Sequence, residues 1–185
     1  GGLDIGESRD RTTLAIVKRI GDKRSLIHLE SHKLTDDKLL DDLAAKAIGV
    51  YHCQRVAIDK TGLGLFPSKR IKQVYGSKIE QVDFTSGSKE DLATGLYDAV
   101  QAEEIELPAS YLFNGVDEIP LLRDDVYAIR RLVTAAGNVR YDAPRTAAGH
   151  ADRAWALMLA IHAAGKQSKM FAALQAAVAR QQQGR

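Results

Sequence analysis

Three aspartates stand where the surrounding residues are apolar. Asp4 interrupts a short apolar strand, Asp59 ends a second one, and Asp152 begins the apolar run of residues 154–161. On a helix, Asp152 shares one face with Trp155, so its carboxylate is directed at the core. A buried carboxylate without a partner is costly, so each of these three acids requires a compensating group nearby.

A shared site explains the three acids better than three separate accidents. Taken singly, each could be a helix cap or a turn carboxylate. In α/β sheets, however, sites form beyond strand ends, where Asp59 and the glycine-rich turn at residues 61–64 lie. Hard carboxylate oxygens select Mg²⁺, Mn²⁺ or Ca²⁺, and two such ions about 3.5–4 Å apart can activate water for phosphodiester cleavage. The residue types and their spacing lead no further.

The elements that must position these acids follow from periodicity and turn signals. Three strands open the chain, and strands then alternate with helices, which predicts a mixed sheet with helices on both faces, an α/β domain. We predict strands at 3–6, 13–17, 26–29, 55–60, 78–84 and 138–144. We predict helices at 35–52 (capped by Thr35), 67–76, 88–107, from about 121 to 137, 149–164 and 166–185.

Composition suits one soluble globular domain. The chain has 185 residues, 45% hydrophobic and 27% charged, and a net charge of +2 gives no global bias toward nucleic acid. The single cysteine, Cys53, excludes an internal disulfide and a cysteine-based zinc site, as expected in a reducing cytoplasm. We see no membrane-spanning run and no signal peptide. A start at GGLDIG, without methionine, suggests a piece of a longer protein, its first glycine or two left by a tag.

Four stretches of the chain carry a resemblance to a known family. They are GLDIGESRDRTTLAIV, VAIDKTGLG, VDFTSGSKEDLATGLYDAVQAEEIELP and GHADRAWALMLA. In this order they resemble the RNase H-like nucleases, and more narrowly the C-terminal nuclease domain of tailed-phage large terminase subunits of the phage Mu-like prophage group. The resemblance covers about residues 2–165. The four stretches are similar to the first acidic strand and its hairpin, the second acidic strand, the strand and lysine-bearing helix, and the last acidic helix of that family.

The resemblance implies a metal-dependent endonuclease that cleaves double-stranded DNA during genome packaging by two-metal hydrolysis. Asp4, Asp59 and Asp152 would hold two Mg²⁺ or Mn²⁺ ions, with Asp10 as a fourth candidate ligand. Ala151 stands where many relatives carry a further aspartate. The implied nuclease domain spans 1–166, and 167–185 would form a C-terminal helix and polar tail.

The resemblance also implies partners in the bacterial host cytoplasm. They are an ATPase domain upstream in the same polypeptide, the phage portal and the small terminase subunit, with no membrane. No GxxxxGK[ST] motif occurs in this chain, so we expect no ATP hydrolysis by it.

Other polar residues near these motifs have both a functional and an ordinary interpretation. His150 and Lys89 could assist at the site or simply be solvated. Basic residues that could contact DNA phosphates are Lys60, Lys69, Arg70, Lys72, Arg145 and Arg153, although surface charge is the commoner fate of such side chains.

Three alternatives stay open at this point. One is an RNase H-fold resolvase or transposase-type nuclease acting on another nucleic acid. A second is a catalytically silent domain that binds DNA or a packaging partner. The LDIG stretch also opens sugar kinases and actin-like ATPases, but these need a second phosphate loop and a larger chain.

Overall fold

A six-stranded mixed sheet forms the centre of the computed structural model, which describes residues 1–6, 10–33, 36–133, 137, 139–144 and 150–165. The strand order is β5-β4-β1-β2-β3-β6. Antiparallel neighbours are β1 (Gly2–Asp4), β2 (Thr12–Ile20) and β3 (Lys23–His32), while β4 (Val56–Asp59) and β5 (Ile79–Val82) run parallel to β1. The α/β class with three antiparallel strands followed by parallel strands is therefore confirmed.

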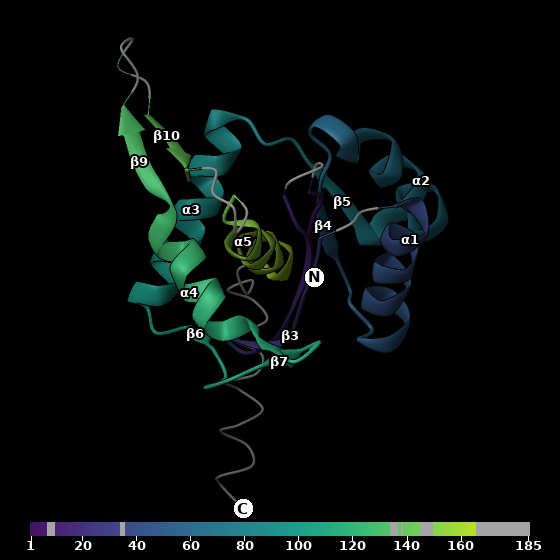
Figure 1. Ribbon diagram of the computed structural model, residues 1–185, viewed down its shortest axis with the longest axis horizontal. Helices are drawn as coiled ribbons and strands as arrows, with labels where there is room; N and C mark the ends of the chain where they lie inside the picture. Colours follow the sequence, from purple (N-terminus) through teal and green to yellow (C-terminus); the bar gives the residue numbers. More distant parts are fainter. Residues whose placement is uncertain (7–9, 34–35, 134–136, 138, 145–149, 166–185) are drawn as a thin grey trace, which may run out of the picture.

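Helices cover both faces of this sheet, as Figure 1 shows. On one face lie α1 (Asp37–Ala45), which continues as a π-helical turn to Val50, and α2 (Leu65–Tyr75). On the other lie α3 (Ser86–Gln101), α4 (Glu118–Ala128) and α5 (Asp152–Ala164). Among the described residues no helix is long and apolar enough to cross a membrane. The lone Cys53 is a buried free thiol, packed in the core on the α1 side.

Helix α5 is the central element of the larger core. Its residues 152–161 are all buried, because the sheet covers one side of the helix and α3 and α4 cover the rest. A helix that is apolar around its whole circumference needs such an enclosed position. Gly2 lets β1 approach closely, since a Cβ there would overlap the backbone of Ala156 and Ala160. Gly2 is thus part of the packing between β1 and α5.

Two predicted helices are shorter than expected, because strands replace their C-terminal parts. The helix predicted over 88–107 ends at Gln101, where Glu103 takes a left-handed conformation, and β6 (Ile105–Glu106) then pairs with β3. The helix predicted to 137 ends at Ala128. The exposed segment β9 (Arg130–Val133) follows and forms a hairpin with β10 (Val139–Asp142). Cross-strand pairing overrides the helical pattern in both places.

Helix starts also differ in detail from the predictions. Asp36 caps α1 through Leu39 N, and the predicted cap Thr35 lies outside the described residues. Asp117 caps α4, which starts at Glu118, three residues before the predicted position. A small hairpin, β7 (Leu112–Phe113) with β8 (Val116–Asp117), precedes α4 and has no counterpart in the sequence predictions. The predicted C-terminal segment 167–185 lies outside the described residues.

Strand β3 carries a buried ionic cluster that the sequence pattern did not predict. Glu30 is 1% exposed, and Lys46 Nζ lies 2.7 Å from both of its carboxylate oxygens. His28 Nε2 lies 3.1 Å from the same carboxylate, and the ring's Nδ1 contacts the Tyr51 hydroxyl at 2.8 Å. Burial raises the pKa of Glu30, but hydrogen bonds from His28 and Lys46 outweigh it and lower the pKa to about 2. Glu30 is therefore a carboxylate that the fold itself compensates.

The lowered pKa of Glu30 predicts a pH-dependent contribution to stability. Because the native state favours the ionised form, the contribution is present above the unfolded pKa of 4.5 and disappears as the pH falls through about 2. We expect Glu30→Gln to cost about 2–3 kcal/mol of unfolding free energy at pH 7, and to match wild type near pH 2. Urea titrations across this range, with the exposed Asp98→Asn as control, test it; a pH-independent loss would contradict it.

The contact at Gly2 gives a second prediction. Gly2→Ala forces α5 away from β1, so we expect a loss of about 1–3 kcal/mol of unfolding free energy and a lower thermal midpoint. Gly95→Ala is the matched control, because a Cβ at Gly95, inside α3, meets open space. That control is expected to be neutral or stabilising by up to about 1 kcal/mol. Equal effects of both changes would contradict the packing argument.

Candidate active site

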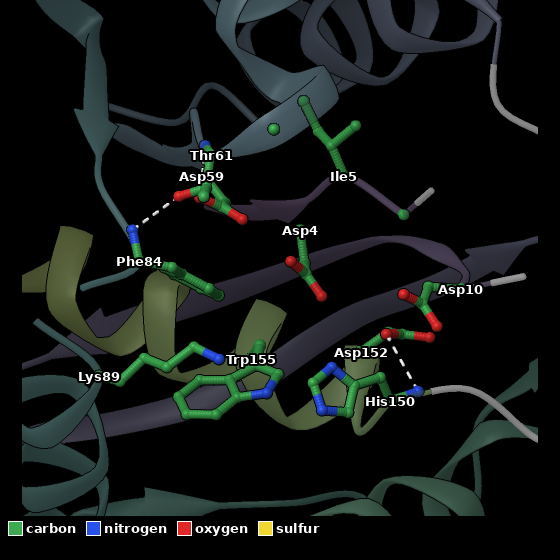
Figure 2. Close-up of a pocket in the computed structure, with 12 residues that line it drawn as sticks. Asp4, Ile5, Asp10, Asp59, Thr61, Phe84, Lys89, His150, Asp152 and Trp155 are labelled. Carbon is green, nitrogen blue, oxygen red and sulfur yellow. Dashed lines mark hydrogen bonds between the residues drawn. The ribbon is translucent and has the colours of Figure 1, made fainter. Parts of the chain in front are cut away.

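The three aspartates singled out in the sequence meet at one cleft. Asp4 ends β1 and Asp59 ends the neighbouring parallel strand β4, so both lie at the same edge of the sheet. Asp152 begins α5 and reaches this edge from the covering helix layer. The cleft has a volume of about 180 Å³, and Figure 2 shows the carboxylates lining it together with Asp10. Lys89, His150, Thr61, Phe84 and Trp155 complete most of its wall.

Backbone amides fix two of the carboxylates. Thr61 N donates to Asp59 Oδ1 at 2.8 Å, within the turn that follows β4. Gly64 has no space for a Cβ, which would overlap the Asp59 carbonyl oxygen, so this turn folds tightly under the acid. Arg11 N donates to Asp152 Oδ2 at 2.8 Å, and His150 N lies 3.3 Å from Oδ1. The predicted turn-forming role of the glycines after Asp59 is confirmed at Gly64.

Asp4 is the least compensated of the acids. Its side chain is 7% exposed, and no hydrogen-bond donor in the described part of the chain reaches its carboxylate. Burial raises the pKa of Asp4 well above 3.8, and the charges of Asp152 and Asp59 raise it further. Burial also raises the pKa of Asp59 and of Asp152, and the hydrogen bonds from the backbone amides described above partly offset this rise. The cleft thus gathers buried carboxylates that repel one another.

Divalent cations suit this donor set. Clustered carboxylate oxygens are the ligands that Mg²⁺ and Mn²⁺ prefer, and a cation removes the repulsion among them. As they stand, the described side chains form no group of three or more acidic, histidine or cysteine residues closed around an ion position. The buried carboxylates of Asp4, Asp59 and Asp152 and the half-buried one of Asp10 fit such ions by their chemistry and their shared cleft.

The predicted auxiliary residues Lys89 and His150 both line the cleft. The Lys89 ammonium lies 4.9 Å from the centre of the Trp155 ring, and Figure 2 shows the lysine reaching over that ring. His150 Nε2 lies 2.6 Å from the carbonyl oxygen of Ala143 and 3.1 Å from Asp142 Oδ1. Trp155 is core, as predicted, but its indole Nε1 is buried with no hydrogen-bond partner within the described residues.

Asp142 is a charged residue near the site that the sequence pattern did not single out. It ends β10, pairs with His150, and lies 3.6 Å from the Lys89 ammonium. Its position at the end of a strand was the available signal, the same one that identified Asp59. The strand predicted over 138–144 placed Asp142 inside the strand and not at its end, which hid that signal.

The basic residues proposed for DNA contact are dispersed. Lys69 and Lys72 are exposed on α2, whereas Lys60 pairs with Asp83 at 2.9 Å. Arg70 bridges to α1 through ion pairs with Asp37 and Asp41. Arg145 lies outside the described residues.

Arg153 corrects the sequence interpretation. Its side chain is buried and paired with Glu118 and Asp125 on α4, so it serves helix packing and is not placed to reach DNA or Asp152.

Comparisons with known proteins identify the family and the fold of this chain. The model of a family described as the terminase RNaseH-like domain matches residues 1–164. Comparison with curated proteins gives no match. The chain is similar in fold to the large terminase nuclease of thermophilic phage G20c with bound magnesium, at a TM-score of 0.67 and 21% identity over 87% of this chain and 78% of that one.

Two further solved structures show the same fold. The large terminase nuclease domain of Thermus phage P74-26 aligns with a TM-score of 0.63 and 19% identity, covering 91% of this chain and 79% of that one. The nuclease domain of the large terminase subunit of bacterial virus Sf6, a mutant solved with manganese and beta-thujaplicinol, aligns at 0.64 and 15%, covering 87% and 86%. The RNase H-like fold is thereby confirmed.

The electrostatics of Asp4 lead to a stability prediction. Its raised pKa means that ionisation destabilises the native state, so its contribution is most favourable below pH 3.8 and worsens as the pH rises. We expect Asp4→Asn to raise the unfolding free energy at pH 7 without divalent ions, by about 1 kcal/mol or more, and to give no gain near pH 3. Chemical denaturation in chelator-treated buffer measures this, beside Asp98→Asn. A loss of stability at pH 7 would refute it.

Proposed function

Because this chain belongs to the terminase RNaseH-like domain family, we propose that it is a divalent-metal-dependent endonuclease that cleaves double-stranded DNA during phage genome packaging. The observation that carries the proposal is the cleft in which Asp4, Asp59, Asp152 and Asp10 converge. A buried acid that served folding alone would have a hydrogen-bond donor or a cationic partner, as Glu30 has in Lys46. Asp4 instead lacks any hydrogen-bond donor in the described structure.

In this proposal the carboxylates hold two Mg²⁺ or Mn²⁺ ions. When bound, such ions lower the pKa of a water molecule and stabilise the leaving oxygen of a phosphodiester. Asp4 and Asp59 offer their oxygens from the rigid sheet edge, while Asp152 offers its own from the buried start of α5. The magnesium, cobalt and manganese in the solved terminase nucleases support this choice of ion.

The other cleft residues have supporting roles. The Lys89 ammonium offers positive charge to a phosphate that enters beside the acids. His150 has its Nε2 bound to Ala143 and Asp142, so its Nδ1 is the ring nitrogen left to contact a water or the substrate. The exposed Lys69 and Lys72 of α2, with Lys60, provide phosphate contacts without base recognition.

We place this activity within a larger packaging machine in the bacterial host cytoplasm. An ATPase domain of the same polypeptide, the phage portal and the small terminase subunit are its proposed partners. Within this chain, β1, β4 and α5 carry the proposed catalytic residues. In this proposal the ATPase domain, the portal and the small subunit deliver and restrain the DNA.

Plasmid cleavage tests the proposal. Supercoiled DNA incubated with the protein and Mg²⁺ or Mn²⁺ should be nicked and linearised, and chelation should abolish this. Asp4→Asn, Asp59→Asn and Asp152→Asn should each reduce the rate by about 100-fold or more, because each removes a charged ligand. Asp98→Asn, an exposed acid on α3, should leave it unchanged.

The same assay separates the alternatives. Equal cleavage by wild type and all three cleft variants would refute the assignment. Preferred cleavage of branched DNA or of an RNA–DNA hybrid would instead favour a resolvase-type nuclease. DNA binding without any cleavage would favour a silent binding domain.

A further inference from the structure

We propose that Asp142 is a positioning residue that holds the Lys89 ammonium off the acidic cluster and so keeps that cluster open to divalent cations. The inference rests on the proposed function for the cations as cofactors. Asp142 is absent from the wall of the cleft, whereas Lys89 and the four acids line it. Asp142 therefore acts from behind, through Lys89.

The Lys89 ammonium lies near two sets of anions, Asp142 and the acidic cluster. Its side chain leaves the first turn of α3 and passes over the rings of Phe84 and Trp155, with Nζ 5.5 and 4.9 Å from their centres. The positive charge of Lys89 lowers the pKa of both Asp4 and Asp59, so the ammonium lies within electrostatic reach of the cluster. Among the described carboxylates, however, only Asp142 is within 4 Å of it, at 3.6 Å.

Asp142 is itself held in place as an anion. The Ala143 amide donates to Asp142 Oδ1 at 3.1 Å, and His150 Nε2 lies 3.1 Å from the same oxygen. The β10 strand that ends at Asp142 pairs with β9 and packs against α3. Burial raises the pKa of Asp142, but Lys89, the Ala143 amide and His150 outweigh it and the pKa is lowered.

Removal of the Asp142 charge would redirect Lys89. The Lys89 side chain is 19% exposed, so water alone compensates its charge poorly. Besides Asp142, the described anions on which the Lys89 charge acts include Asp4 and Asp59 of the cluster. A lysine side chain has a flexible four-carbon stem and can turn toward them. An ammonium ion paired with Asp4 would occupy the position and cancel the charge that a divalent cation needs.

Metal binding without DNA tests this directly. Isothermal titration with Mn²⁺ should show about 10-fold weaker binding for Asp142→Asn than for wild type. Lys89→Met keeps the aliphatic stem over Trp155 but removes the charge. In the Lys89→Met background, Asp142→Asn should change the affinity no more than the exposed control Asp98→Asn does, and Asp142→Glu should restore most of the affinity in the Lys89 background.

The remaining outcomes overturn the inference. An equal loss with and without Lys89 would show a general charge effect, and unchanged affinity in Asp142→Asn would show that Lys89 needs no anchor. A wild-type protein that binds no Mn²⁺ would likewise refute it. The plasmid assay reports separately on the proposed function, because DNA phosphates can complete a metal site, so the two failures can be told apart.

Discussion

The close packing of α5 against β1 is the contact on which the site depends. Gly2 leaves space for the backbone of α5, and the helix is enclosed from Asp152 to Ile161. This packing fixes where α5 begins relative to β1, and therefore places Asp152 at the same sheet edge as Asp4. Parallel pairing of β1 with β4 brings Asp59 to that edge as well. One helix and two strands, each held by core packing, thus position three carboxylates that would otherwise repel one another.

Ionisation of the buried acids lowers the stability of the folded state, and the packing of the core must offset this loss. Burial and mutual repulsion raise the pKa values of Asp4 and Asp152, so ionisation works against folding. The apolar length of α5 provides the opposing free energy, because it buries a long run of side chains in the larger core. The packing of α5 therefore both holds Asp152 in place and offsets the free-energy cost of burying its charge. A bound cation would remove most of the cost, which links metal binding to stability.

The sequence was sufficient to predict the mixed α/β sheet and to single out the three acids that meet at the cleft. A carboxylate at the end of an apolar strand or at the start of an apolar helix is conspicuous. It was insufficient where a tertiary contact decided the outcome. Residues 130–133 match a helical pattern but pair with β10 as a strand. Arg153 follows Asp152 directly, yet the helix geometry directs it to Glu118. Asp142 and Glu30 each pair with a lysine from another element, Lys89 and Lys46, and no local pattern reveals these pairs.

The contrast between Glu30 and Asp4 gives the strongest argument that the acidic cluster is functional. Both carboxylates are buried, and each has a lysine in its neighbourhood. At Glu30 the lysine lies directly on the carboxylate, two histidines stand beside it, and the pKa falls to about 2. At Asp4 the lysine pairs with Asp142 instead, and the pKa rises. This fold can neutralise a buried acid with its own cations, and among the described residues it supplies none in direct contact with Asp4. That difference supports the proposed role of Asp4 as a ligand for a cation from outside the chain.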